Sequence, residues 1–107
     1  LRDAPLPAGT DAMGYLGMSA PALKQTMRGY REIARAKVVL GDRIVGQLDY
    51  AYDQPGGRGR NRAYFFACDG YGYVLTCSSR PEAFDRYAAV FHQIAESLEP
   101  VEPPKQP

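Results

Sequence analysis

Apolar residues in the last third of the chain recur at spacings of three and four, the period of an amphipathic α-helix. Polar residues occupy the positions between them. Just upstream, Ser79 and Glu82 have the spacing of a capping box, and Pro81 suits an early helical position, where no backbone donor is needed. The pattern predicts a helix from about residue 81 to residue 98, with an apolar stripe of Phe84, Tyr87, Ala88, Phe91, Ile94, Ala95 and Leu98.

The middle of the chain alternates apolar and polar residues, as strands with one drier and one wetter face do. In the segment 44–53 the even positions include the apolar residues Ile44, Leu48, Tyr50 and Tyr52. Asp69-Gly70 is the strongest turn signal, because both positions accept the positive φ angles of a two-residue hairpin. The sequence therefore predicts strands at about 37–40, 44–53, 60–68 and 71–77, separated by turns at Gly41-Asp42, Gln54–Gly57 and Asp69-Gly70.

The N-terminal third also has a helical stripe, formed by Leu16, Ala20, Leu23, Met27 and Tyr30. Thr10 or Asp11 is a suitable N-cap. Pro21 interrupts the stripe, and each glycine inside a helix weakens it by about 1 kcal/mol. We therefore expect helix over most of 11–28, with a break or kink near 18–21.

Size and charge then limit the functions to consider. The chain has 107 residues, 45% apolar and 23% charged, which is typical of one globular domain. A formal net charge of +1 does not favour nucleic acid or anionic lipid as a partner. No apolar run approaches the ~18 residues of a membrane span. The proline-rich residues 100–107 suggest a tail or linker, and the N-terminus resembles a cut inside a longer chain, so the compartment stays open.

The two cysteines lie on either side of the predicted hairpin turn. With a two-residue turn Cys68 faces Tyr71, and Cys77 lies further along the second strand. At ~3.3 Å per residue the two cysteines are about 20 Å apart, whereas a disulfide needs Cα atoms within ~7 Å. A wider loop still leaves roughly 13 Å between them. We expect two structural thiols and no disulfide.

Motifs for catalysis and metal binding are missing from the sequence. Two cysteines and the lone His92 do not have the paired spacing of zinc ligands. His92 falls on the polar side of the predicted helix, and no nucleophile motif flanks either cysteine. The glycines of Gly56–Gly59 and Gly70–Gly72 precede strands, so neither segment is a phosphate-binding loop. The sequence predicts no enzyme, no metal and no cofactor.

Tyrosines and arginines are the remaining candidates for a binding surface. Arginines alternating with aromatic residues could contact nucleic acid, but the near-neutral charge favours instead an arginine-rich sheet edge. Tyrosine suits a half-exposed sheet surface, so packing under the helices and partner binding are both open. We take as the partner-binding hypothesis a sheet surface that captures an apolar segment or a second copy, formed by Tyr50, Tyr52, Tyr71 and Tyr73 with Arg58, Arg60 and Arg62 at its rim.

The order of these segments resembles that of the PsbP/DcrB-like superfamily over about residues 5–99. The resemblance implies an α/β/α sandwich around an antiparallel sheet, in one domain spanning 1–99. Members usually begin with further strands ahead of the Leu-Pro-x-Gly segment, and the sequence suggests none here. We therefore expect either a domain without its first strands or a sheet that another segment completes. The resemblance rests on Leu6–Gly9, Gly29-Tyr30, Gly41-Asp42, the alternating tyrosines, Asp69-Gly70 with Tyr73–Thr76, and Pro81–Phe84.

The resemblance also implies a non-enzymatic role. Members include a lumenal photosystem II accessory protein, a Ran-release factor, bacterial envelope lipoproteins and cytoplasmic chaperones of type VI secretion effectors. They share the habit of binding another protein through the sheet or its flanking loops. We therefore expect a protein-binding accessory or chaperone-like domain whose partner is another protein or a second copy in a homodimer. The alternative is an envelope lipoprotein, and bacterial cytoplasm and periplasm both stay open.

Overall fold

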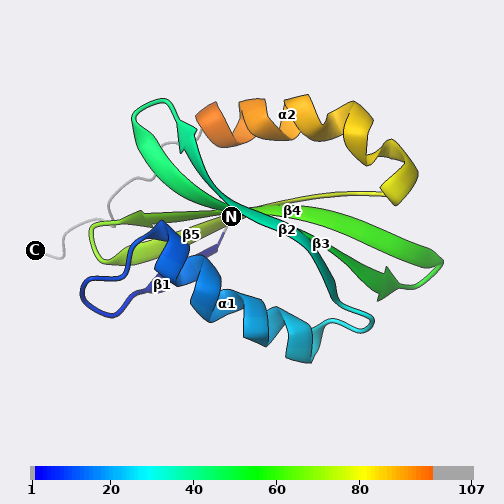
Figure 1. The fold of residues 1–107 in the computed structure, drawn as a ribbon, viewed down its shortest axis with the longest axis horizontal. Coiled ribbons are helices and arrows are strands. Elements are labelled where there is room, and N and C mark those ends of the chain that lie inside the picture. The colour runs from blue at the N-terminus through cyan, green and yellow to red at the C-terminus, as the bar shows by residue number, and fades with distance from the viewer. Residues whose placement is uncertain (1, 98–107) are drawn as a thin grey trace, which may run out of the picture.

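The computed structural model describes residues 2–97, with side chains from Pro5 onward. A single five-stranded antiparallel sheet lies between two helices, one on each face (Figure 1). The sheet order is β1-β5-β4-β3-β2. The α/β/α sandwich predicted from the sequence is thus confirmed. The elements are β1 (Arg2–Pro5), α1 (Ala12–Thr26), β2 (Arg31–Leu40), β3 (Arg43–Gln54), β4 (Gly57–Cys68), β5 (Tyr71–Ser79), the 3₁₀ turn η1 (Pro81–Ala83) and α2 (Phe84–Ser97).

The strands β2 to β5 form a meander of three hairpins. Cys68 pairs with Tyr71, and the turn residues Asp69 and Gly70 have φ angles of 52° and 80°, so the predicted hairpin is confirmed. Strand β2 is much longer than predicted and begins at Arg31 rather than Lys37. The early half of β2 is exposed and charged, which hides the alternation that marks a half-buried strand.

Helix α1 begins where Asp11 caps it, with the Asp11 carboxylate accepting a hydrogen bond of 2.8 Å from the backbone N–H of Gly14. The helix then runs unbroken through Pro21, so of the predicted break or kink near 18–21 the break is wrong. Pro21 is exposed, while Leu16 and Ala20 pack onto the sheet. This apolar contact holds the helix together across the hydrogen bond that a proline cannot make.

Helix α2 has the predicted position but a different start. Strand β5 extends to Ser79, whose hydroxyl donates to the carbonyl of Arg80, and no side chain caps the turn that follows. The predicted capping box of Ser79 and Glu82 is therefore wrong, because Ser79 is still part of the strand. A 3₁₀ turn leads into α2 at Phe84. The predicted last residue, Leu98, lies outside the described residues, as does the predicted tail 100–107.

Each face of the sheet has its own core under one helix. Strand alternation sends neighbouring residues to opposite faces, so the two cores share no side chain. The α1 core contains Leu16, Ala20, Leu48, Tyr50, Ala63 and Phe65. The α2 core contains Leu40, Val45, Tyr64, Phe66, Tyr73, Cys77, Phe84, Phe91 and Ala95.

A strand does precede Leu6, contrary to the expectation from the sequence. Strand β1 pairs with Tyr71–Val74 of β5 and occupies the sheet edge opposite β2. Its four residues contain no alternating pattern and end at Pro5, which is tolerated at a sheet edge. Neither described helix is long and apolar enough to cross a membrane.

Candidate functional site

The four tyrosines of the predicted binding surface lie on opposite faces of the sheet. Tyr50 is 2% exposed in the α1 core, its ring lies 5.3 Å from that of Tyr30, and its hydroxyl accepts a hydrogen bond from Asn61. Tyr73 is buried in the α2 core, and Tyr71 packs against that core. The prediction that one surface contains all four rings is wrong, because strand alternation separates them. Tyr52 is half-buried beside Tyr50.

The three arginines do not form a free rim either. Arg58 bonds the carboxylate of Asp53 at 2.6 Å and the carbonyl of Gly29 at 3.0 Å. Arg60 and Arg62 lie over the ring of Phe84, with their Cζ atoms 3.9 and 5.0 Å from its centroid. These cation–π contacts join β4 to the start of α2. Both side chains therefore hold the fold together.

Asp49 is the polar residue that sequence reasoning did not select. It is 5% exposed, and its two carboxylate oxygens accept hydrogen bonds from Arg62. The bonds to Asp49 raise the pKa of Arg62. Burial raises the pKa of the nearby Cys77 thiol, so that group is held protonated at neutral pH. The ion pair of Asp49 and Arg62 is thus a structural element. Its signal in the sequence is an aspartate between apolar residues of one strand.

The cysteines also have the predicted structural setting. Cys77 is buried in the α2 core, and Cys68, at the hairpin end, donates a weak hydrogen bond to Asp69 at 3.5 Å. Both are thiols, and no disulfide joins them. Among the residues that the structure describes, no group of three His, Cys, Asp or Glu side chains could hold a metal ion. The absence of an enzymatic activity stays a prediction.

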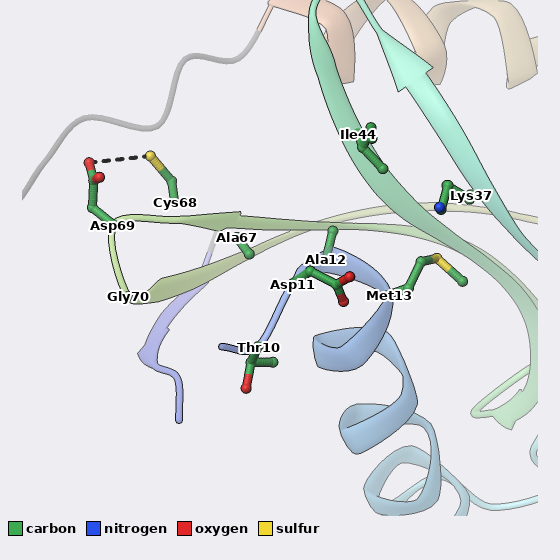
Figure 2. A pocket seen from close by; sticks show the side chains of 10 residues that line it. All are labelled: Thr10, Asp11, Ala12, Met13, Lys37, Ile44, Ala67, Cys68, Asp69 and Gly70. Atoms are coloured by element: carbon green, nitrogen blue, oxygen red, sulfur yellow. Dashed lines mark hydrogen bonds between the residues drawn. The ribbon is translucent and has the colours of Figure 1, made fainter. Parts of the chain in front are cut away.

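The described residues line several open clefts, and two of them flank the sandwich. The first, of about 290 Å³, lies between the start of α1 and the β4–β5 turn (Figure 2). Its carboxylate Asp11 is already engaged as the cap of α1, and Cys68 and Asp69 point toward each other. The second, of about 360 Å³, lies between the β3–β4 turn and η1. Its Arg58 is engaged by Asp53. Polar side chains line both clefts, with Lys37 in the first and Arg80 and Glu82 in the second, but none of them is buried, whereas small-molecule sites gather polar groups in an enclosed pocket.

The β2 edge, meaning residues Arg31–Leu40, is a candidate surface for binding another chain. Strand β2 ends the sheet order, so one side of its backbone has no strand partner among residues 2–97. Its side chains are exposed from Arg31 through Lys37. Val39 pairs across the hairpin with Ile44, and these two apolar side chains are 64% and 55% exposed. Backbone groups and apolar surface are thus both available at this edge.

Helix α2 has a smaller exposed apolar stripe. Tyr87, Val90 and Ile94 follow a helical spacing and are 44%, 46% and 42% exposed. They lie beside Phe91, which is buried against the sheet. Part of the apolar surface of α2 is therefore left exposed next to the part that packs on the sheet. The stripe lacks the unpaired backbone groups that the β2 edge has.

No protein-family model matches the sequence, and no curated protein matches it. Among solved structures, the crystal structure of PA94 from Pseudomonas aeruginosa is similar, with a TM-score of 0.72 and 16% sequence identity. The match covers 95% of this chain and 83% of PA94. PA94 is described as a protein of unknown function and a candidate regulator. At this identity the likeness supports the fold alone.

Proposed function

We propose that this chain is a non-enzymatic, PsbP/DcrB-like accessory or chaperone-like domain that binds an extended segment of a partner protein at the β2 edge. The observation that carries the proposal is the position of β2, a 10-residue strand at the end of the sheet whose outer side has no strand partner among the described residues. An unpaired strand edge is a template for strand addition, in which main-chain hydrogen bonds supply affinity.

The rest of the sheet supports this choice of surface. Each face is covered by a helix, and of the four tyrosines predicted for binding Tyr50 and Tyr73 are buried there, while Tyr52 and Tyr71 are partly buried. The opposite edge strand, β1, has only four residues and ends at Pro5, and a short edge strand with a proline is a poorer template for strand addition than the ten-residue β2. The exposed pair Val39 and Ile44 adds apolar surface next to the open backbone. Protein binding is also the role that the PsbP/DcrB-like resemblance implies.

Selection of ten-residue peptides from a random phage-displayed library, followed by NMR amide exchange, tests the proposal. We expect the tightest peptides to slow exchange of alternate β2 amides at least tenfold while leaving β1 amides unchanged. The Val39→Lys variant should weaken binding, whereas Val90→Lys on α2 serves as a matched control and should not. Protection on α2 or in the clefts, or the absence of any peptide binding below about 1 mM, would overturn the proposal.

A further inference from the structure

The side chains of the β2 edge differ sharply between its two faces. Lys37 pairs with Gly46, and a Cβ added at Gly46 would meet Leu16, so this position faces α1. Arg35 pairs with Leu48 of the α1 core and therefore lies on the same face. Because strand residues alternate, the intervening positions face α2. After the bulge, from Ala34 onward, the α2 side of the edge consists of Ala34, Ala36, Val38 and Leu40, none of them charged.

Charge on the α1 side is positive and only partly neutralised. Arg35 donates from Nε and Nη2 to the two carboxylate oxygens of Glu32, so its single positive charge is already matched, and Lys37 is the unmatched charge on this side. Within residues 5–97 no carboxylate forms an ion pair with Lys37, which is exposed. The bulge between Glu32 and Ala34 and the Glu32–Arg35 pair protect the early half of the edge from pairing. The accessible half is therefore the segment from Arg35 to Leu40.

We infer that the segment added at β2 is an amphipathic strand with acidic residues on its α1 side and apolar residues on its α2 side. Side chains directly opposite on neighbouring strands lie about 4.5–5.5 Å apart, within reach of an ion pair or an apolar contact. A partner residue opposite Lys37 is therefore acidic, and those opposite Ala36 and Val38 are apolar. Opposite Val39 an apolar residue is favoured as well, since Val39 is 64% exposed.

This pattern can be written as a short sequence. Read antiparallel to β2, from the position opposite Val39 to that opposite Ala34, it is apolar, apolar, acidic, apolar, acidic, apolar. The second acidic residue lies opposite Arg35, whose guanidinium it would share with Glu32, so the ion pair with Lys37 is the main source of the acidic preference. The inference rests on the proposed strand addition and adds to it the chemistry of the partner, which is an extended acidic–apolar segment of a protein.

Two synthetic peptides test the inference: one with the core VVEVEV, and one with the core VVKVKV and the same solubilising ends. We expect the glutamate peptide to bind the intact chain about three- to tenfold more tightly, with slowed exchange of β2 amides. The Lys37→Glu variant should reverse the preference. Lys24→Glu, which changes an exposed lysine on α1, should leave the preference unchanged.

The outcomes separate the two proposals. If neither peptide slows exchange at β2, strand addition itself fails. If both peptides protect β2 equally and Lys37→Glu has no effect, strand addition stands and the acidic preference is wrong. Tighter binding of the lysine peptide would overturn the inference directly. Salt should weaken the glutamate peptide alone, because only that pairing is attractive.

Discussion

Arg62 on β4 and Asp49 on β3 face each other across neighbouring strands and form a two-point ion pair, with Nε 2.8 Å from Oδ1 and Nη2 2.9 Å from Oδ2. The two side chains are 16% and 7% exposed, under the start of α2. Such a pair offsets the cost of burying both charges only while both partners are present. The residue that the sequence placed at a binding rim is therefore fixed inside the fold.

Removing the Asp49 charge should destabilise the fold strongly. Asp49→Asn leaves the buried guanidinium of Arg62 without its counter-ion, and we expect a loss of about 3–5 kcal/mol in the free energy of unfolding. Glu32→Gln provides the matched control, because Glu32 and Arg35 form an exposed pair worth less than about 1 kcal/mol. Urea denaturation of both variants checks the prediction. Equal losses in the two would contradict the role assigned to burial.

Replacing either of two glycines with alanine should change the stability of the fold, but in opposite directions. A Cβ at Gly72 on β5 would overlap with the ring of Tyr15, which packs edge-on against Phe65 at 5.3 Å. Gly72→Ala should therefore cost about 1–3 kcal/mol as the ring is displaced. Gly17 in α1 has open space around it, so Gly17→Ala should stabilise by roughly 0.5–1 kcal/mol. Thermal unfolding measures both, and a stabilising Gly72→Ala would show that the ring moves freely.

The thiols should differ in reactivity. Cys77 is buried and burial raises the pKa of its thiol, which lowers the thiolate fraction that reacts. Cys68 is only half-buried at the hairpin end. We expect two thiols per chain to react with Ellman's reagent in denaturant without reductant, and Cys68 to react first in the native protein. Finding no thiol in a monomeric denatured sample would contradict the hairpin register.

Stability should fall at alkaline pH. Burial raises the pKa of the Cys77 thiol and of the Tyr50 and Tyr64 hydroxyls above their unfolded values. A raised folded-state pKa means that the fold favours the protonated form. The stability that each group contributes is complete below its pKa in the unfolded chain, about 8.5 for cysteine and 10 for tyrosine. This stability is lost as pH rises through the pKa of the group in the folded protein.

Urea midpoints at pH 7 and at pH 10 test this pH dependence. We expect a lower midpoint at pH 10, and a smaller drop in Cys77→Ala, which removes the first group to ionise. The variant is compared with itself at the two pH values, so its own cavity cost cancels. A midpoint that does not change between the two pH values would show that burial does not hold these groups protonated.

Periodicity in the sequence predicted helix α2, which buries one side, and the position of strand β3. The predicted drier and wetter faces of β3 were wrong, because helices cover both faces of the sheet: Val45 is buried in the α2 core, Leu48 in the α1 core, and Ile44 is 55% exposed. The Asp69-Gly70 turn is decided by backbone angles that few residues accept. Strand β1 and the early half of β2 were missed because edge strands bury little and have no alternation to detect. The break expected at Pro21 was wrong, because local propensity was outweighed by packing of Leu16 and Ala20.

The candidate site was predicted less well than the fold. Alternation along β3 grouped Tyr50 with Tyr52 correctly, since both lie on the α1 face. Grouping them with Tyr73 required knowing the register between strands, which the sequence of one strand does not contain. The β2 edge could not be selected from the sequence either. Which strand ends a sheet is set by the pairing of all five, above all by β1 joining β5.

The pairing of Arg2 with Val74 closes the longest loop in the sheet, whereas β2 to β5 are joined by tight turns. Short loops cost less entropy to close, so the four-strand meander should assemble early and β1 should add last. The same order in reverse makes β1 the first strand to detach in native fluctuations. A brief opening would then expose the outer side of β5 as a second edge, one that the protein's own N-terminal residues normally keep paired.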